Sequence, residues 1–277
     1  MTYTFFLQEE VVKMSDIPSI ENSKNVIFKL RDIRNWREVI DDLVWDVSGT
    51  PVVFCSIQVA KYIQRHVPKL ASGLIISNKS PEPQIGMSSI FDWNQYSTFI
   101  PIKHLLNPKG SGRMMTFAEA MDSDFDLPER VFVRPNTGWK PFTGFSCPSD
   151  NLWQELNALS QTEHVDPSEI VIVFDEKNIV QEYRYWIVDS QISTCSSYSW
   201  DAEDICKKPE KDIDNYVESV LQYPDNIGLT EYVIDVAILG DGSIKVVELN
   251  ALSTSGWYGA MDYEKLIYDV TKIYGGV

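Results

Sequence analysis

The chain has 277 residues, 44% of them hydrophobic, and carries a formal net charge of -16 at pH 7. This length is enough to bury a sizeable core and predicts two or three compact parts rather than one small module. The acidic balance argues against a nucleic acid as the main partner, because binding to a phosphate backbone depends on dense lysine and arginine.

Strand and helix patterns alternate in the first part of the chain. Tyr3 to Leu7, Val26 to Leu30 and Val52 to Phe54 read as strands, and Trp36 to Val44 reads as a helix. Such alternation predicts a small α/β domain. Ser77 to Ser89 contains prolines and polar residues and is expected to form a loop.

A second part of the chain is expected to begin after Pro108-Lys109-Gly110-Ser111-Gly112, the best candidate for a domain boundary. We therefore predict an N-terminal α/β domain over residues 1–112 and a second domain over residues 113–277. A helix from Thr116 to Met121 should follow, because Thr116 can cap it and Glu119 lies three residues further on. Further helices are expected from Leu152 to Leu159, from Asp212 to Leu221 and from Asp262 to Ile273.

A short strand, Val131 to Pro135, carries Arg134 near its end and leads into a loop, residues 136–144, that contains Lys140. Glycines in the loop let its backbone approach a phosphate closely, and the two cations can donate hydrogen bonds to it. The sequence has no Gly-x-x-x-x-Gly-Lys-Ser/Thr motif, and no Gly-x-Gly-x-x-Gly follows a strand. Phosphate binding and an ordinary exposed turn with two cations therefore stand as equal alternatives for this loop.

The next two strands are predicted from Glu169 to Phe174 and from Ile179 to Val188, joined by a polar bend over residues 175–178. In the second strand Glu182 and Arg184 lie two residues apart and share a face. They either form a cross-strand ion pair on the sheet surface, worth about 0 to 1 kcal/mol if exposed, or serve a ligand. In the second case Arg184 reaches a terminal phosphate, and Glu182 orients it or a substrate. The residues alone leave both alternatives open.

A β-hairpin is the strongest local prediction in the chain. Two strand-like runs flank Gly240-Asp241-Gly242-Ser243, and Asp-Gly between such runs is a strong hairpin signal. A two-residue loop at the centre of this motif would pair Gly240 with Ser243. That register places Asp235 directly opposite Glu248.

Three oxygen-bearing side chains should converge in this hairpin. Asn250 lies two residues beyond Glu248 and shares its face, which Asp235 reaches from the neighbouring strand. Two opposed carboxylates repel each other by a few tenths to about 1 kcal/mol at an exposed site and by more in a buried one, so a cation would stabilise them. The alternative is that the acids decorate a solvated sheet face. Against it, Ile244 and Val246 continue the face of Glu248 as an apolar one.

The chemistry of this oxygen set indicates its ligand. Hard oxygen donors, with few protein ligands and room for water and phosphate, suit Mg²⁺ better than zinc. The hairpin therefore predicts a site for a magnesium nucleotide.

Taken in order, the elements from Arg134 to about Tyr258 resemble the ATP-grasp superfamily. They comprise a strand ending in Arg-Pro, a glycine-bearing loop, a hinge strand, a Glu-x-Arg strand, and an Asp strand paired with a Glu-x-Asn strand. The set Asp235, Glu248 and Asn250 is similar to the magnesium-binding set of that superfamily. It is the most specific part of the resemblance.

Finer motifs resemble a small clade of this superfamily known mainly from phage and bacterial genomes. Val133-Arg134-Pro135 looks like the superfamily's Val-Lys-Pro, with arginine where lysine is commoner. Glu182-Tyr183-Arg184 and the stretch from Ser253 to Tyr258 are similar to the clade as well. Less specific segments of the N-terminal half look like its leading domain: Pro51 to Phe54, Ala60 to Arg65 and His104 to Asn107.

The resemblance implies an ATP-grasp fold of the α/β (α+β) class. An N-terminal α/β pre-ATP-grasp domain, residues 1–112, would precede the ATP-grasp domain, residues 113–277. Two subdomains of the latter would clamp the nucleotide, a lid-like part at about 130–176 and a metal-binding part at about 177–277.

The resemblance also implies roles for individual residues. Asp235, Glu248 and Asn250 would hold Mg²⁺, while Arg134 and Lys140 would bind the α and β phosphates of ATP. The catalytic residues would be Arg184, facing the γ-phosphate, and Glu182 beside it.

The adenine is expected to receive backbone hydrogen bonds from the hinge segment, which comprises Val173, Phe174, Asp175 and Glu176. Asp175 or Glu176 would reach the ribose. Trp257 and Tyr258 follow the metal strand and could floor an acceptor pocket, whereas most other aromatic residues are expected in the core. A further basic ATP contact is expected upstream, from Lys103, Lys109 or Arg113.

The implied reaction is an ATP- and Mg²⁺-dependent ligation. A carboxylate of an amino acid, peptide or protein attacks the γ-phosphate of ATP, and an amine captures the resulting acylphosphate with loss of phosphate. A catalytically silent nucleotide-binding regulatory module and a kinase-like phosphoryl transfer are the alternatives. Retention of both acids, Asn250 and Arg184 favours the ligase. The acceptor and the oligomeric state follow from no readable motif.

The remaining sequence features exclude several classes. Four scattered cysteines form no Cys-x-x-Cys unit, so they indicate neither a zinc site nor a disulfide framework and are expected as reduced thiols. No apolar segment approaches 18 residues, and residues 1–10 lack the basic start and long apolar run of a signal peptide. We therefore expect no membrane contact and a cytoplasmic location.

Overall fold

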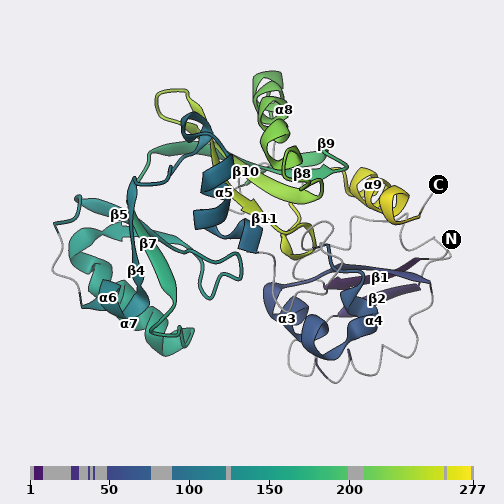
Figure 1. The fold of residues 1–277 in the computed structure, drawn as a ribbon, viewed down its shortest axis with the longest axis horizontal. Helices are drawn as coiled ribbons and strands as arrows, with labels where there is room; N and C mark the ends of the chain where they lie inside the picture. Colours follow the sequence, from purple (N-terminus) through teal and green to yellow (C-terminus); the bar gives the residue numbers. More distant parts are fainter. Residues whose placement is uncertain are drawn as a thin grey trace. The chain divides into compact units, whose positions relative to one another are not determined.

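The computed structural model describes residues 3–8, 26–30, 37, 40, 49–75, 89–122, 126–198, 209–258 and 261–275 (Figure 1). Their strands and helices form a mixed α/β fold, which confirms the expected class. The chain divides into two compact units. Unit 1 comprises residues 1–88, 181–236 and 248–277, and unit 2 comprises residues 89–180 and 237–247. The expected domain division at residue 112 stays a prediction.

The N-terminal part of unit 1 forms a parallel sheet. Strands β1 (Tyr3–Gln8), β2 (Val26–Leu30) and β3 (Thr50–Phe54) are arranged in the order β2-β1-β3 within the described residues. The three strands predicted in this region are therefore confirmed. The helix expected at Trp36 to Val44 and the loop expected at Ser77 to Ser89 lie almost entirely outside the described residues.

Alternate side chains of β1 and β3 enter two different cores, because successive residues of a strand point to opposite faces. On one face Phe6 and Val53 pack with buried residues of the two helices that follow β3. On the other face Phe5 and Phe54 pack with buried residues of helix α9 (Tyr263–Gly275). Both faces of the sheet are covered, as is usual for parallel strands. The two helices after β3 are α3 (Ile57–His66) and α4 (Pro68–Ala71).

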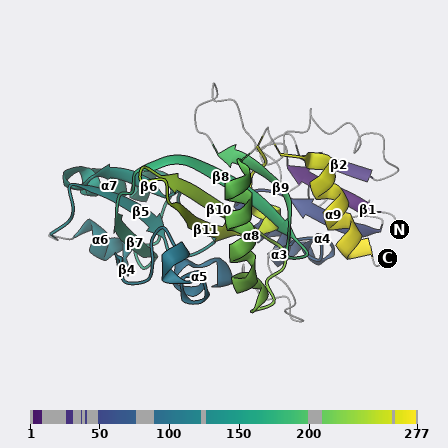
Figure 2. The same ribbon diagram turned by 90° about the horizontal axis from the view of Figure 1, so that it is seen from above.

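A second sheet carries the later strands of the chain. Its order is β11-β10-β8-β9 among the described residues, so β8, β10 and β11 are neighbours (Figure 2). Helix α8 (Lys211–Asp225) packs against β9. With α9, it confirms two of the predicted helices. The strands are β8 (Ile179–Val188), β9 (Gln191–Tyr198), β10 (Tyr232–Leu239) and β11 (Ile244–Asn250).

The turn between β10 and β11 is one residue longer than predicted. The carbonyl of Leu239 accepts a hydrogen bond from Gly242, and the N–H of Leu239 donates one to the carbonyl of Ser243, both at 2.9 Å. The predicted pairing of Gly240 with Ser243 is therefore wrong, because Leu239 takes that place and the loop has three residues. Gly242 has a φ of 80°, the left-handed conformation that closes such a loop and that glycine adopts without strain.

This turn changes the expected register of the hairpin. A regular ladder continued from it would place Asp235 opposite Val247 and on the other face from Glu248. Hydrogen bonds nevertheless join Asn250 to both acids. The two strands must therefore depart from a regular ladder between the turn and these side chains.

Unit 2 is built on a third sheet, in the order β4-β7-β5-β6 with antiparallel neighbours. Helices α6 (Phe117–Met121) and α7 (Leu152–Thr162) contribute buried residues to its core (Figure 1). The predicted capping box of α6 is present, since Thr116 and Glu119 exchange side-chain-to-backbone hydrogen bonds. The strands are β4 (Gly112–Thr116), β5 (Arg130–Pro135), β6 (Phe145–Pro148) and β7 (Ile170–Asp175).

Two regular elements of unit 2 were not anticipated. Strand β4 begins at Gly112, inside the segment expected to be a domain boundary, and pairs with β7. Helix α5 (Trp93–Phe99) falls in a stretch for which no element was predicted. Short 3-10 helices lie at Ser89–Phe91, Ile102–His104, Ser149–Asn151 and Leu252–Thr254.

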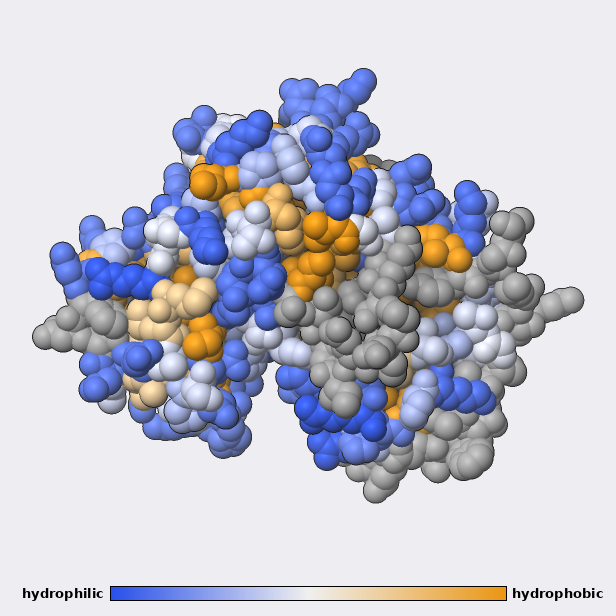
Figure 3. Space-filling view, in the orientation of Figure 1, coloured by the Kyte–Doolittle hydropathy of each residue, from blue (hydrophilic) through white to orange (hydrophobic). Residues whose placement is uncertain are grey.

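Hydrophilic side chains cover most of the described surface on the face drawn in Figure 3. The most exposed large hydrophobic residues come from separate elements, with exposed fractions of 67% for Ile102, 66% for Val180 and 65% for Tyr268. None of the described helices combines the length and the apolar character needed to cross a membrane.

The close approach of Gly73 to β3 gives a first test of the fold. A Cβ atom at this position would lie 2.6 Å from the carbonyl oxygen of Pro51, a backbone atom that cannot move aside easily. We expect Gly73→Ala to lower the free energy of unfolding by about 1 to 3 kcal/mol, as overpacking generally does, in urea titrations followed by circular dichroism. Gly256→Ala is the matched control, because its Cβ would meet nothing closer than 3.9 Å. Equal stability of the two variants would contradict the packing described here.

Candidate functional site

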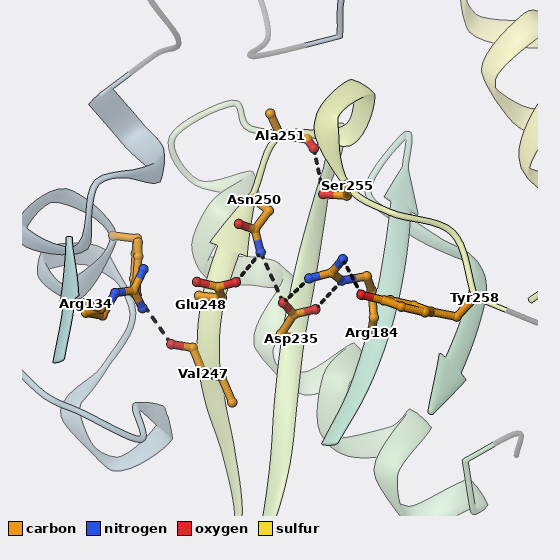
Figure 4. A network of polar contacts seen from close by, with 10 residues as sticks. Arg134, Arg184, Asp235, Val247, Glu248, Asn250, Ala251, Ser255 and Tyr258 are labelled. Carbon is orange, nitrogen blue, oxygen red and sulfur yellow. Dashed lines mark hydrogen bonds and ion pairs between the residues drawn. The ribbon is translucent and has the colours of Figure 1, made fainter. Parts of the chain in front are cut away.

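A polar cluster of Arg184, Asp235, Glu248 and Asn250 lies on strands β8, β10 and β11 (Figure 4). Arg184 donates through Nε to Oδ1 of Asp235 and through Nη2 to Oδ2, both at 2.8 Å. The two side chains are only 8% and 1% exposed. Each oxygen of the carboxylate therefore faces one arm of the guanidinium in a buried, bidentate ion pair.

Asn250 joins the two acids of the cluster. Its Nδ2 donates to Oδ2 of Asp235 at 3.1 Å and to Oε1 of Glu248 at 2.9 Å. The three side chains predicted to converge are thus brought together (Figure 4). The cation that the sequence requires beside two such acids is supplied in the structure by Arg184.

Burial shapes the charge state of Arg184. Desolvation by itself lowers the pKa of its guanidinium, but the charge and hydrogen bonds of Asp235 raise that pKa by more, so the net pKa lies above its usual range. Arg184 is therefore a permanently charged, buried group. The alternative of an exposed surface ion pair at Glu182 and Arg184 is wrong, because Arg184 is buried and pairs with Asp235 on the neighbouring strand.

An aromatic residue completes the surroundings of Arg184. The Tyr258 hydroxyl lies 3.3 Å from Nη1 of Arg184, and the Tyr258 ring centroid lies 5.2 Å from its Cζ, which is within cation–π range. Trp257, which was expected to share a pocket with Tyr258, instead packs 5.0 Å from the ring of Phe54 and is 3% exposed. Of the two aromatics, Trp257 belongs to the core and Tyr258 to the polar cluster.

The oxygen donors of the cluster fit Mg²⁺. Asp235 and Glu248 supply carboxylates, and a half-turn of the Asn250 amide would exchange its donor for its oxygen. The described residues contain no group of three or more His, Cys, Asp or Glu suited to a metal. An ion here would thus have two carboxylate ligands, the sparse protein coordination that Mg²⁺ prefers when it also binds water and phosphate.

In unit 2, Arg134 lies near the end of β5 and is 5% exposed. Its Nη1 donates to the hydroxyl of Tyr96 at 2.9 Å, and its Cζ lies 5.9 Å from the centroid of the Tyr96 ring. The Tyr96 hydroxyl in turn donates to the carbonyl of Val247 at 3.3 Å. The predicted phosphate-binding arginine is therefore held by a tyrosine that the sequence did not indicate.

The loop after β5 is anchored to the start of helix α5. Oδ1 of Asp92 accepts a hydrogen bond from the N–H of Gly138 at 2.8 Å, and Oδ1 of Asn136 accepts one from Asn94 at 3.0 Å. Burial raises the pKa of Asp92, while hydrogen bonds from Gly138 and Thr137 act to lower it. The first half of the loop is thus fixed.

Lys140 lies in the second half of this loop with a φ of 41°. Few residues other than glycine adopt this left-handed conformation, and such strain often accompanies function. The N–H of Lys140 donates to the carbonyl of Thr137 at 3.2 Å, which turns the chain at this point. The loop is therefore a defined turn that presents Lys140, and the choice between a phosphate loop and an ordinary turn stays open.

The hinge segment links two different sheets, because β7 belongs to the third sheet and β8 to the second. Val173 and Phe174 are buried, and the Phe174 ring lies 5.4 Å from that of Trp93. Asp175 is exposed. The Glu176 carboxylate pairs with Arg130, whose hydrogen bond lowers the pKa of that acid. Of the two acids expected near a ribose, Glu176 is therefore already engaged in an ion pair.

The structure places the three upstream cations on the surface. Lys103, Lys109 and Arg113 are all exposed. Arg113 alone of these three lies within a strand, and it is the register partner of Val173 in the ladder between β4 and β7.

Asp92, Asn94 and Tyr96 were not found from the sequence as residues of the site. The signal available was local: Trp93, Tyr96 and Ile100 are buried at helical spacing. That spacing could have predicted helix α5, but not its contacts with residues about 40 positions further along the chain.

Solved structures of similar fold are ligases. D-cycloserine synthetase shares 11% sequence identity over 99% of each chain with a TM-score of 0.60. The D-alanine–D-alanine ligase from Bacillus anthracis complexed with ATP shares 16% identity over 91% of this chain and 86% of that chain, with a TM-score of 0.54. The L-amino acid ligase from Bacillus licheniformis shares 10% identity over 90% of this chain and 66% of that chain, with a TM-score of 0.52.

At these identities the neighbours show a common fold, that of ATP-grasp proteins. Residues 102–270 match a family described as an ATP-grasp domain, family 3 of its clade, and the chain therefore belongs to that family. The resemblance seen in the sequence is confirmed. A search of curated protein sequences finds no match.

The buried ion pair makes a testable prediction about stability. Replacing Arg184 by alanine leaves Asp235 buried without its bidentate partner, so we expect Arg184→Ala to lower the free energy of unfolding by about 3 to 5 kcal/mol. Urea titration measures this loss. Arg130→Ala is the control: it removes an arginine from the exposed pair with Glu176 and should have a far smaller effect. Similar losses in both variants would contradict a special role for burial at Arg184.

Proposed function

We propose that the protein is an ATP- and Mg²⁺-dependent carboxylate–amine ligase that works through an acylphosphate and releases ADP and phosphate. The observation that carries this proposal is the polar cluster, in which two acids, an amide and a buried arginine meet within a member of an ATP-grasp family. The ligase names of its structural neighbours agree with it. Amino acid, peptide or protein carboxylates are the proposed acyl donors, and an amine is the acceptor.

In this proposal the residues of the polar cluster serve the reacting end of ATP. Asp235, Glu248 and Asn250 hold Mg²⁺, which neutralises phosphate charge when it is bound. Arg184 faces the γ-phosphate and stabilises the charge that develops on it, while Glu182 orients the arginine or the substrate. The bidentate pair with Asp235 holds the guanidinium in one orientation, so little reorganisation is needed during transfer.

In unit 2 the proposed nucleotide contacts are Arg134 and Lys140 for the α and β phosphates. The backbone of Val173, Phe174 and Asp175 would bind the adenine, and Asp175 would reach the ribose, because Glu176 is paired with Arg130. Arg113 is the preferred upstream cation, since it lies in the ladder opposite Val173. A cytoplasmic location is part of the proposal. The described cysteines, Cys55, Cys147 and Cys195, are free thiols, as expected there.

The proposal is tested by nucleotide turnover. ATP is incubated with the protein, with and without Mg²⁺ and a mixed pool of amino acids and peptides, and ADP and AMP are separated by chromatography. We expect ADP that depends on Mg²⁺ and increases with the pool. AMP as the product would contradict an acylphosphate. Tight ATP binding without any turnover would favour the regulatory module, and phosphate transfer to a hydroxyl would favour a kinase-like reaction.

Glu248 offers the sharpest test of the metal assignment. Glu248→Gln keeps the size and the polar character of the side chain but removes its charge, so we expect turnover to fall by roughly 10² to 10³. Glu248→Ala should be at least as impaired. Lys109→Ala is a surface control that should leave turnover within about twofold, since isolated surface charges contribute little. Wild-type turnover in Glu248→Ala would contradict the assignment.

Metal binding can also be measured without turnover. A ligand that binds only the folded protein stabilises it by about 2.7 kcal/mol when present at 100 times its dissociation constant. We expect ADP with Mg²⁺ to raise the melting temperature of the wild type more than ADP alone does. In Glu248→Gln that Mg²⁺-dependent increment should disappear, whereas the increment from ADP alone should remain. An unchanged Mg²⁺ increment in the variant would place the metal elsewhere.

A further inference from the structure

Helix α5 contacts all three segments of unit 2 that are expected to bind the nucleotide. The ring of Trp93 packs on Phe174 of the hinge segment, and Asp92, at the N-cap of the helix, accepts a hydrogen bond from Gly138 of the loop. Tyr96, one turn along the helix, contacts Arg134. One short helix therefore connects the hinge segment, the loop and the phosphate-binding strand.

The contact of Tyr96 with Arg134 is geometrically defined from two sides. Tyr96 is fully buried, and its hydroxyl lies 2.9 Å from Nη1 of Arg134 and 3.3 Å from the carbonyl oxygen of Val247. A guanidinium can only donate and a carbonyl can only accept, so the hydroxyl accepts from Arg134 and donates to Val247. Both the direction of the hydroxyl and that of the guanidinium are thereby fixed.

Such fixation matters more for arginine than for lysine. A guanidinium is a planar fork whose hydrogen bonds have set directions, whereas an ammonium group presents three donors that rotate freely. A long side chain also loses conformational freedom when it binds a ligand, and a side chain that is already ordered loses less. An arginine in the place of the usual lysine therefore benefits from a partner that sets its orientation.

We propose that Tyr96 is a positioning residue for nucleotide binding. Its hydroxyl holds the guanidinium of Arg134 in the orientation in which Arg134 donates to the phosphates of ATP. The inference rests on the proposed function in one respect, that Arg134 contacts a phosphate. Tyr96 itself, being fully buried, does not need to touch the nucleotide.

A double-mutant cycle tests the inference. Binding of a non-hydrolysable ATP analogue with Mg²⁺ is measured by isothermal titration calorimetry for the wild type, Tyr96→Phe, Arg134→Ala and the double variant. Phenylalanine keeps the ring over Arg134 and removes only the hydroxyl. We expect Tyr96→Phe to weaken binding by about three- to tenfold, and Arg134→Ala by about tenfold or more, given the strength of charge-assisted hydrogen bonds. The double variant should bind within about twofold of Arg134→Ala alone, because the hydroxyl acts through the arginine.

Tyr185→Phe is the matched control for the loss of a buried hydroxyl. Tyr185 is also fully buried, and its hydroxyl donates to Asp214 at 2.8 Å. Its removal should lower stability without weakening nucleotide binding. A merely structural effect of Tyr96→Phe would instead appear in urea titrations, would be shared by Tyr185→Phe and would persist in the Arg134→Ala background.

The outcomes separate the inference from the proposed function. If Arg134→Ala weakens binding and Tyr96→Phe does not, the inference is overturned while the proposed function stands. Equal weakening by Tyr96→Phe in the presence and absence of Arg134 also overturns it, because the hydroxyl then acts by another route. A wild-type protein that does not bind the ATP analogue would overturn the proposed function, and the inference with it.

Discussion

The buried ion pair of Arg184 with Asp235 is the interaction on which the polar cluster depends. Removing two charges from water is costly, and their attraction offsets the cost only when the geometry is good and the remaining polar atoms are satisfied. Both conditions are met: two hydrogen bonds of 2.8 Å join the pair, Asn250 donates to the acid, and Tyr258 lies against the arginine. The same contacts stabilise the fold and fix the donors of the candidate site.

The ion pair also sets the charge that a metal would meet. Asp235 and Glu248 carry two formal negative charges, and Arg184 already neutralises one of them. A Mg²⁺ ion held by this cluster would still need negative ligands, which the phosphates of a nucleotide can supply. In this view metal and nucleotide bind best together, since each provides the charge that the other lacks. Asn250 is central to the exchange, because its amide bridges the two acids and can offer either a donor or an oxygen.

Unit 2 uses a different physical device. Arg134 is oriented by a tyrosine, because the Tyr96 hydroxyl and ring provide a hydrogen bond and a cation–π contact. Helix α5 carries this tyrosine and, through Asp92 and Trp93, also contacts the loop and the hinge segment. A rigid helix can therefore keep three nucleotide-binding segments in a fixed relation within this unit, which is the preorganisation that phosphate recognition favours.

Local chemistry in the sequence determined the strands of the parallel sheet, the capping box of α6 and the common face of Glu248 and Asn250, because side-chain alternation and capping depend on near neighbours. Even there, a glycine in the left-handed region added a residue to the turn of the hairpin, and the predicted register was wrong. Only the tertiary structure decided that Arg184 pairs with Asp235, 51 residues away, and Arg134 with Tyr96, 38 residues away. Such partners are set by strand order and by the packing of a helix on a sheet, and no local periodicity records either.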